Sequence, residues 1–328
     1  MTYYQASIYI GGDLISSSMP DSKLNRIKFP ESDLTWISIN DPTEEQLNSL
    51  KKAYKFHSLD IEDCLSETQR PKIDDYEDYL FIVLQLPVKK GKKGQVRIAE
   101  IDIFVGQNFV ITLHDDSNIL KNLFENCNKN KKLREEYMGK GSGYFLYMII
   151  DDLFAAGFPL IDEMTKSMNE LETDVFENDY SRDRLKDILF LKKNIINFRR
   201  IIMPQRVIIA QLEHKNKKFL AENLEVYFDD VVDKIEKIWN SLENLQELVA
   251  SLQETNESII SHNTNNIIKV LTIFSVIMLP LNLITGFYGM NVEGLPYAGH
   301  PLAVVLVSSF LAMVVLAMVA YFRYRKWI

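Results

Sequence analysis

NNIIKVLTIFSVIMLPLNLITGFYGMN, residues 265–291, is the stretch that decides the fold of this 328-residue chain. From Val270 to Met290 it holds 21 residues without a charge, and about 20 such residues cross the hydrocarbon core of a bilayer. A second uncharged run of 21 residues extends from Leu302 to Phe322. The sequence therefore predicts a membrane protein with two spans, both near the C-terminus.

A stripe of small and polar residues distinguishes the first span. Amides and hydroxyls are costly against lipid, so the stripe is expected to face other helices or water. Helix packing through small residues and the lining of a pore both fit such a pattern. The stripe follows a 3-4 repeat, which places its members on one face of a helix: Asn265, Ile268, Thr272, Ser275, Leu279, Asn282, Gly286 and Gly289.

A regular apolar repeat precedes this span and predicts a very long helix. No Gly or Pro interrupts the sequence before Pro280, so one helix is expected from about Leu224 to Tyr288, roughly 100 Å long. An apolar seam needs a partner, and symmetric self-association is the simplest source of one. The seam has the 4-3 spacing of a coiled coil and consists of Leu224, Phe228, Val231, Ile235, Ile238, Leu242, Leu245, Val249 and Leu252.

The N-terminal part of the chain predicts a mixed α/β domain. A helix is expected to begin at Asp41, with Asp41 as its cap and Pro42 in its first position. A second short helix is expected after His57. Runs rich in β-branched and aromatic residues are expected to form strands at residues 5–10, 36–39, 79–86, 98–105 and 109–113.

Two helical segments of opposite charge follow the α/β domain. Residues 144–179 are acidic and residues 181–212 are basic. Tyr180 and Ser181 are expected to form the turn between them, with Ser181 as the cap of the second helix. The segments are therefore predicted to pair as an antiparallel hairpin, and most of their charges are expected to form solvated faces.

Charge and cysteine content place the large N-terminal part in the cytoplasm. Of 37 basic and 45 acidic residues, four basic and one acidic lie after residue 260, which leaves 33 basic and 44 acidic residues before it. Such an acidic domain suits cations and argues against nucleic acid. Two isolated cysteines fit a reducing compartment, and the N-terminus lacks a signal-peptide pattern. Arg323, Arg325 and Lys326 follow the second span, so the positive-inside rule predicts that the C-terminus lies on the cytoplasmic side of a cell membrane. With two spans, the N-terminus is expected on the same side.

The end of the first span carries a recognisable motif. Tyr288-Gly289-Met290-Asn291 closes the span, a short loop leads into the second span, and a basic tail ends the chain. Gln69-Arg70-Pro71-Lys72 and Tyr227-Phe228-Asp229-Asp230 add to the pattern upstream. The chain resembles the CorA family of magnesium transporters, whose signature is a Gly-Met-Asn triplet at this place. The resemblance extends over essentially the whole chain.

The resemblance implies an α+β membrane protein that assembles as a homopentameric funnel. A long stalk helix in each subunit is expected to continue into the first of two C-terminal transmembrane helices. The expected divisions are a cytoplasmic α/β domain at 1–142, a helical hairpin and stalk at 143–266, a pore-lining transmembrane helix at 267–290, an external loop with the filter at 291–301, a second transmembrane helix at 302–322 and a basic cytoplasmic tail at 323–328.

The triplet implies the selectivity element of a cation pore. Mg²⁺ holds its water tightly, and amide oxygens can accept hydrogen bonds from that water without holding the ion too strongly to release it. The resemblance gives this role to Gly289, Met290 and Asn291. Deeper positions are expected to line the pore, with the aliphatic ones able to gate by dewetting: Asn265, Ile268, Leu271, Thr272, Ser275, Leu279, Asn282 and Gly286.

Acidic residues suggest a second role for Mg²⁺, as a regulator. Family members sense intracellular Mg²⁺ between cytoplasmic domains, and the matching positions are Glu62, Asp63 and Asp230. Carboxylates crowded at an interface repel, and a hard divalent cation would neutralise them and join the subunits. Loss of the cation would then bias the pore towards opening.

The predicted function is thus passive transport of divalent cations, with copies of the chain, membrane lipid and the cations themselves as partners. No constellation of catalytic residues indicates an enzyme. The choice among Mg²⁺, Co²⁺ and Ni²⁺ stays open, because the outer loop has one acid, Glu293, and Asn282 replaces an expected threonine. Met290 favours a magnesium transporter over a zinc transporter of the same superfamily. A membrane-anchored cation sensor or scaffold that does not conduct is the other alternative.

Overall fold

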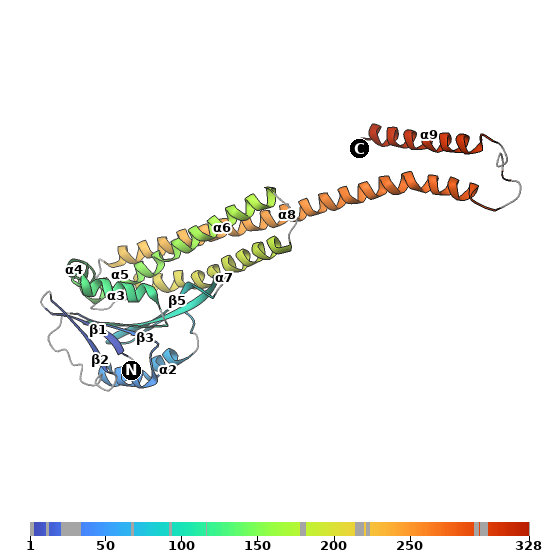
Figure 1. Cartoon of the computed structure of the whole chain (residues 1–328). Coiled ribbons are helices and arrows are strands. Elements are labelled where there is room, and N and C mark those ends of the chain that lie inside the picture. Colours follow the sequence, from blue (N-terminus) through green and yellow to red (C-terminus); the bar gives the residue numbers. More distant parts are fainter. Residues whose placement is uncertain are drawn as a thin grey trace. The chain divides into compact units, whose positions relative to one another are not determined.

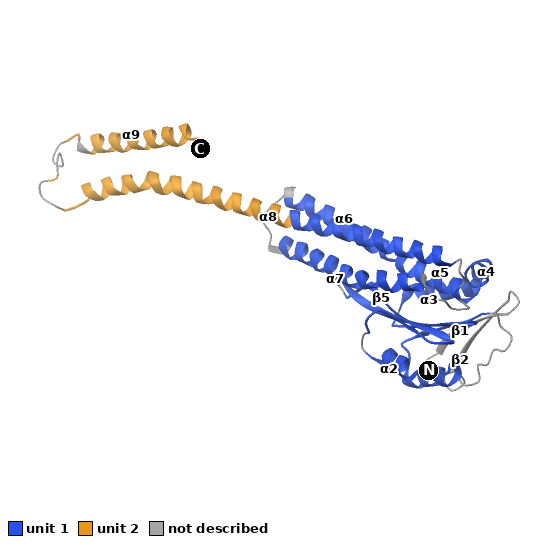
Figure 2. Cartoon of the chain, turned by 180° about the vertical axis from the view of Figure 1, so that it is seen from behind, with its two compact units in different colours: residues 1–251 blue, residues 252–328 orange. Residues whose placement is uncertain are grey.

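The computed structural model describes residues 3–10, 13–20, 34–66, 69–91, 94–115, 117–177, 182–213, 220, 224–291, 295 and 301–327. Figure 1 shows its helices and strands. The chain divides into two compact units, residues 1–251 and 252–328, coloured separately in Figure 2.

A 7-stranded sheet forms the framework of the first unit, in the order β2-β1-β3-β7-β6-β5-β4. Strands β3 and β7 pair in parallel, and every other neighbouring pair is antiparallel. Each of the five predicted strands is present, whereas β2 and β4 were not predicted. The strands are β1 (Tyr3–Ile10), β2 (Asp13–Pro20), β3 (Leu34–Asn40), β4 (Lys72–Asp75), β5 (Tyr79–Lys90), β6 (Gln95–Gly106) and β7 (Phe109–His114).

Helices cover both faces of this sheet (Figure 1). On one face, α1 (Glu44–Tyr54) and α2 (Ser58–Leu65) bury Leu47, Leu50 and Ile61 against Ile37 and other strand residues. On the opposite face, the ring of Trp36 packs against Phe124 of α3 (Asn118–Lys129) and Phe145 of α5 (Ser142–Ala155), each at a centroid distance of 5.0 Å. Alternate residues of β3 thus pack against the helices on the two opposite faces of the sheet. Helix α4 (Lys131–Met138) packs against α3 and α5.

The first helix begins later than predicted. Asp41 is not its cap, because Asp41 has a left-handed backbone with φ of 50°, and its N–H donates to the carbonyl of His114 at 2.9 Å. The cap is Thr43, whose hydroxyl accepts from the N–H of Gln46, while the Gln46 side chain accepts from the N–H of Thr43. This is a capping box. The second helix begins after His57, as predicted, with the His57 ring as its cap.

The acidic helical segment is broken in two, whereas one helix was predicted. It consists of α5 and α6 (Gly157–Glu177), and α6 lies beside α7 (Arg182–Glu213) as the predicted hairpin requires. Tyr180 and Ser181, the expected turn and cap, lie outside the described residues. A Cβ on Gly157 would lie 3.1 Å from Ile238 and 3.4 Å from Phe198. The break therefore lies where three helices approach closely.

The long helix α8 runs from Glu225 to Tyr288 over 64 residues, as predicted. All nine residues of the apolar seam are 5% exposed or less. Their cover comes from the same chain: the Phe228 ring lies 6.3 Å from that of Tyr147 in α5, and Arg199 of α7 stacks over Trp239 of α8 at 4.3 Å. The seam was expected to need neighbours, with further copies of the chain as their simplest source; in the structure these neighbours are helices of the same chain.

Within the part of the chain that the structure describes, three helical stretches are long and apolar enough to cross a membrane, whereas two were predicted. The additional one, Ser142–Val175, has 44% of its most apolar window buried inside the protein, against 6% for Glu225–Tyr288 and 0% for Val304–Tyr324. Its apolar residues belong to the core that covers the sheet. The two predicted spans are the end of α8 and α9 (Ala303–Tyr324), which make up most of the second unit.

Candidate functional site

The polar stripe of α8 lies on the side of the helix that faces away from α9. The partly covered residues of the span are Ile273, Ile277, Pro280, Leu281 and Ile284, and α9 runs beside this part of α8 in both views (Figures 1 and 2). At 100° per residue, these positions lie about half a turn from the stripe. All eight stripe residues and Leu271 are exposed, and the Leu279 side chain is 70% exposed.

The hydroxyl groups of the stripe donate to their own helix. Thr272 donates to the carbonyl of Ile268 and Ser275 to that of Leu271, both at 2.8 Å. Each hydroxyl oxygen keeps lone pairs on the exposed surface. The stripe therefore offers hydroxyl and amide oxygens, the latter from Asn265 and Asn282, between aliphatic residues. Such a surface can accept hydrogen bonds from the water around a cation.

The Gly-Met-Asn triplet begins where α8 ends. The N–H of Gly289 donates to the carbonyl of Thr285 at 2.9 Å and that of Met290 to the carbonyl of Phe287 at 3.4 Å. Asn291 follows the last turn and is exposed. A Cβ on Gly286, one turn earlier, would meet nothing within 4 Å. The triplet is thus positioned by the rigid end of a long helix, while the predicted loop at 292–294 and 296–300 lies outside the described residues.

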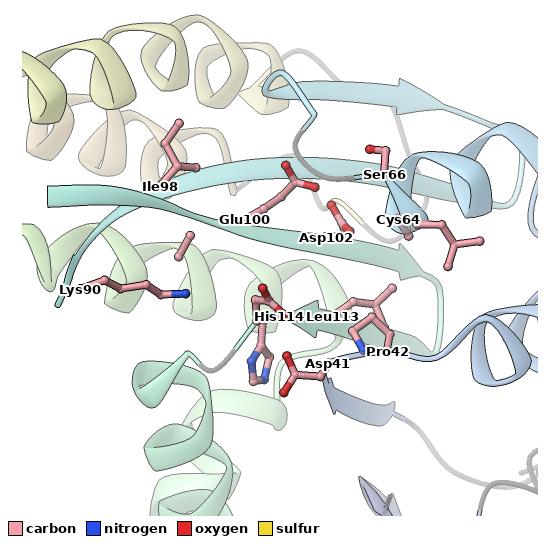
Figure 3. A pocket seen from close by; sticks show the side chains of 13 residues that line it. Asp41, Pro42, Cys64, Ser66, Lys90, Ile98, Glu100, Asp102, Leu113 and His114 are labelled. Carbon is pink, nitrogen blue, oxygen red and sulfur yellow. The ribbon is translucent and has the colours of Figure 1, made fainter. Parts of the chain in front are cut away.

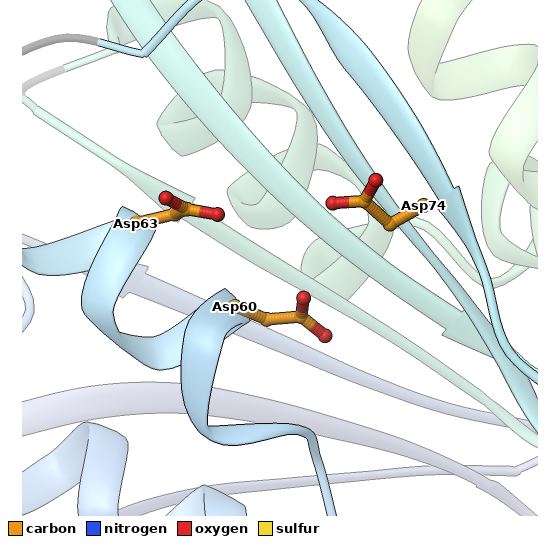
Figure 4. A group of neighbouring side chains, drawn as sticks. All are labelled: Asp60, Asp63 and Asp74. Carbon is orange, nitrogen blue, oxygen red and sulfur yellow. The ribbon is translucent and has the colours of Figure 1, made fainter.

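The predicted regulatory residue Asp63 belongs to a cluster of three acids, shown in Figure 4. The carboxylate oxygens of Asp60, Asp63 and Asp74 lie within 4.8 Å of one another. Lys72 of β4 offsets part of the negative charge of this cluster: its ammonium group lies 2.6 Å from Asp63 and also pairs with Asp74. Burial lowers the pKa of Lys72, but the two aspartates raise it by more, so the side chain stays protonated.

Asp60 is the buried member of this cluster and already has partners. The hydroxyls of Tyr76 and Tyr79 each donate to its carboxylate at 2.7 Å. Burial nevertheless raises the pKa of Asp60, and the two hydroxyls partly offset that effect. The three acids are therefore held by a lysine and two tyrosines, and Asp63 and Asp74 are the partly exposed members, whose shared charge partner a cation could replace.

The other two predicted regulatory residues are exposed and lie on different layers. Glu62 is on α2, on the α1 side of the sheet, whereas Asp230 is on α8, in the helical layer beyond the opposite face (Figure 1). One chain therefore does not bring Glu62 and Asp63 together with Asp230. Lys72 is the last residue of the Gln69-Arg70-Pro71-Lys72 motif, but the sequence alone assigned it no role at this site, because its pairing with Asp63 depends on how α2 packs against β4.

Comparisons with known proteins give a consistent result over nearly the whole chain. A family model described as CorA-like Mg²⁺ transporter protein matches residues 31–326. The cobalt/magnesium transport protein CorA of Thermotoga maritima is 27% identical over 296 residues, covering 90% of this chain and 83% of that protein. The zinc transport protein ZntB of Yersinia pestis is 18% identical, covering 89% of this chain and 88% of that protein.

A solved structure agrees with the fold. The complete CorA magnesium transporter from Methanocaldococcus jannaschii matches with a TM-score of 0.85 and 22% identity, covering 100% of this chain and 99% of that one. The two proteins share an N-terminal α/β domain, a long helix and apolar C-terminal helices.

Proposed function

This chain belongs to the family of CorA-like Mg²⁺ transporter proteins, and we propose that it is a passive channel for divalent cations, with Mg²⁺ as its principal cargo. The family is one of transporters, and two apolar helices place the chain in a membrane. The observation that carries the proposal is the exposed stripe of α8, opposite the face that α9 covers. A polar, uncovered surface within a membrane span requires either a partner or water.

In the proposed assembly, copies of the chain form a homopentamer with the stripes turned towards a common axis. Asn291 would then form a ring at the outer mouth that accepts hydrogen bonds from hydrated Mg²⁺, and Asn282 and Asn265 would form further rings along the path. Leu279, Leu271 and Ile268 would narrow the pore between them. The predicted division of the chain fits this proposal, with both termini in the cytoplasm and a filter loop at 291–301.

The test is Mg²⁺ uptake into liposomes that contain the purified protein under a potential that is negative inside. Asn291→Ala removes the amide oxygen and is expected to reduce the uptake to the level of empty liposomes. Leu302→Ala, at the start of the second span, is the control and should retain uptake. If Asn291→Ala conducts as the wild type does, Asn291 is not the filter.

We further propose that cytoplasmic Mg²⁺ closes the channel by binding between subunits at Glu62, Asp63 and Asp230. The positions of these residues on separate layers support a site shared by two chains rather than one. A cation at that interface would compete with Lys72 for the carboxylate of Asp63. Neutralising the facing acids would join the cytoplasmic parts, and their separation at low Mg²⁺ would favour the open state.

This regulation predicts a change in proteolysis. Mg²⁺ should slow the cleavage of the wild-type cytoplasmic part by trypsin, and Asp230→Lys should remove that protection because it places an ammonium group in the cation site. Asp229→Lys adds the same charge at the neighbouring exposed position and is the matched control. Protection that persists in Asp230→Lys but not in Asp229→Lys would move the site to Asp229.

Zinc transport is the second candidate, favoured by the likeness to ZntB. Met290 within the triplet supports magnesium instead. Competition by Mg²⁺, Co²⁺, Ni²⁺ and Zn²⁺ in the same liposomes separates the two candidates. A sensor or scaffold without conduction would give no uptake of any of these ions.

A further inference from the structure

A cavity of about 320 Å³ lies in the first unit, on the α1 and α2 side of the sheet. The end of α2, strand β6 and the end of β7 contribute to its lining, and Figure 3 shows the side chains that surround it. Its lining is rich in acids: Asp41, Glu100, Asp102 and Asp115. None of these residues belongs to the proposed pore or to the proposed interface between subunits.

Two of the acids, Glu100 and Asp102, occupy strand positions that normally hold apolar core residues. Glu100 and Asp102 alternate along β6 with Ile101 and Ile103, on the same face as Phe104, which belongs to the hydrophobic core. In the sheet, Asp102 lies between Val83 of β5 and Leu113 of β7. Both neighbours are apolar and fully or almost fully buried. The sequence thus places a carboxylate where its hydration is largely removed.

One oxygen of the Asp102 carboxyl group lacks a hydrogen-bond partner among the described residues. The Asp102 side chain is 6% exposed, and this oxygen, Oδ1, is buried. The thiol of Cys64 hydrogen-bonds to the carboxyl group. Burial raises the pKa of Asp102 to about 7, and the negative charge of Glu100 adds to the effect. A buried carboxylate without compensation is costly.

Glu100 stands beside Asp102 and is half-buried. It accepts a hydrogen bond from the N–H of Gln69 at 2.6 Å, which leaves its other lone pairs available. Burial raises the pKa of Glu100 as well. In Figure 3 both carboxyl groups lie on the cavity, with Cys64 and Ser66 at one side and His114 at the other. Lys90 also lines the cavity, and it is exposed at the rim.

A hard divalent cation satisfies these groups better than a further amine would. Mg²⁺ is commonly bound through one or two carboxylates and keeps several of its waters. A water occupies about 30 Å³, so the cavity has room for a cation with its inner waters. Such an ion would bind the carboxyl group of Asp102, neutralise its repulsion with Glu100 and hydrogen-bond through its waters to the remaining polar lining.

We propose that this cavity is a divalent-cation site within a single subunit, with Glu100 and Asp102 as its protein ligands and water as the others. The site lies on the cytoplasmic α/β domain and requires no second chain, so it differs from the proposed interface site. It also does not depend on the pore. The cation concentration would determine how often this site is occupied, and binding there would affect α2, the helix that carries Glu62 and Asp63.

The experiment counts bound Mn²⁺, a paramagnetic substitute for Mg²⁺, on the full-length protein in detergent. The electron paramagnetic resonance signal of free Mn²⁺ falls as the ion binds. Asp102→Asn keeps the size of the side chain and removes its charge, and it is expected to bind one Mn²⁺ fewer per subunit than the wild type. Glu100→Gln tests the second ligand on a half-buried residue, where misfolding is less of a concern.

Asp230→Asn is the control that separates this site from the proposed interface. It should retain the ion that Asp102→Asn loses, and the double variant should show both losses if the interface also binds Mn²⁺. Excess Mg²⁺ should displace the ion. The proposal is overturned if Asp102→Asn and Glu100→Gln both bind as many Mn²⁺ ions as the wild type with the same affinity. Failure of transport would leave this count unaffected, so the two proposals can fail separately.

Discussion

Thr43 and Asp41 illustrate how a single backbone angle decides the role of a residue. Both can cap a helix, and the sequence favoured Asp41 because Pro42 follows it. Asp41 instead takes a left-handed turn with φ of 50°, which directs the chain so that Thr43 meets Gln46. Residue preference alone does not reveal this, because the turn depends on the hydrogen bond between Asp41 and His114 of another strand.

Thr43→Ala is therefore expected to lower the free energy of unfolding by about 1 kcal/mol, since it removes the hydroxyl that accepts from Gln46. Urea unfolding of the full-length protein in detergent, followed by circular dichroism, measures the change. Asp41→Asn is the matched control: asparagine tolerates a positive φ, so its effect should be small. If Thr43→Ala unfolds with the same free energy as the wild type, the Thr43 hydroxyl does not cap the helix.

Lys72 shows a limit of sequence reasoning at a candidate site. The acids at 62, 63 and 230 could be selected from the resemblance, but their surroundings could not. Asp63 and Lys72 are nine positions apart and pair only because α2 packs over the end of β4. The carboxylate at Asp102 was missed for a related reason: within a strand of alternating pattern it looks solvent-facing, and only the packing of α2 shows that it is buried.

At the scale of elements, the spacing of apolar residues predicted those helices and strands that the local sequence determines. The limits of α8 agree with the prediction to within one residue, because no helix-breaking residue occurs before Pro280 and the seam keeps its spacing. Strands β2 and β4 and helices α3 and α4 were not predicted. Strand β2 contains three consecutive serines, and β4 has 4 residues. Neither segment predicts a strand by its own sequence, and both are strands because the neighbouring strands β1 and β5 pair with them.

The seam itself was predicted, but its partner was not. Periodicity shows that a face is buried without showing what buries it. Here α5, α6 and α7 of the same chain do so, with Ile238 close to Gly157 and Phe198. Arg199 and Arg206 of α7 add ion pairs to Glu243 and Glu236 of α8, although exposed pairs of this kind contribute little.

Ile238→Ala is expected to lower the free energy of unfolding by about 2–5 kcal/mol, because the side chain is fully buried and its removal leaves a cavity. Leu248→Ala removes a similar side chain from the same helix, where it is 53% exposed, and should cost about 0.5 kcal/mol or less. Urea unfolding in detergent measures both. Equal losses for the two variants would contradict burial of the seam within one chain.

At the scale of the whole molecule, the seam is buried within one chain and so does not itself need further copies. The proposed assembly therefore depends on the membrane-spanning part of α8. The first unit buries its own core and the seam residues from Leu224 to Val249. In the second unit, α9 covers one side of the span in α8 and leaves the polar stripe uncovered. The surface on which the proposed pentamer depends is thus the stripe.

The stripe and the covered face of α8 can be compared directly, because their residues alternate along one helix. In the proposed channel, Ser275 faces water on the axis and Ile277 faces α9. Cysteine at position 275 is therefore expected to react with a positively charged thiol reagent and to block Mg²⁺ uptake into liposomes almost completely. Cysteine at position 277 should leave uptake nearly unchanged, and so should treatment of the wild type, whose Cys64 and Cys127 lie far outside the spans. Block through Ile277→Cys without block through Ser275→Cys would place the ion path on the α9 side of the helix, and block through neither would leave the stripe as a dry contact between helices.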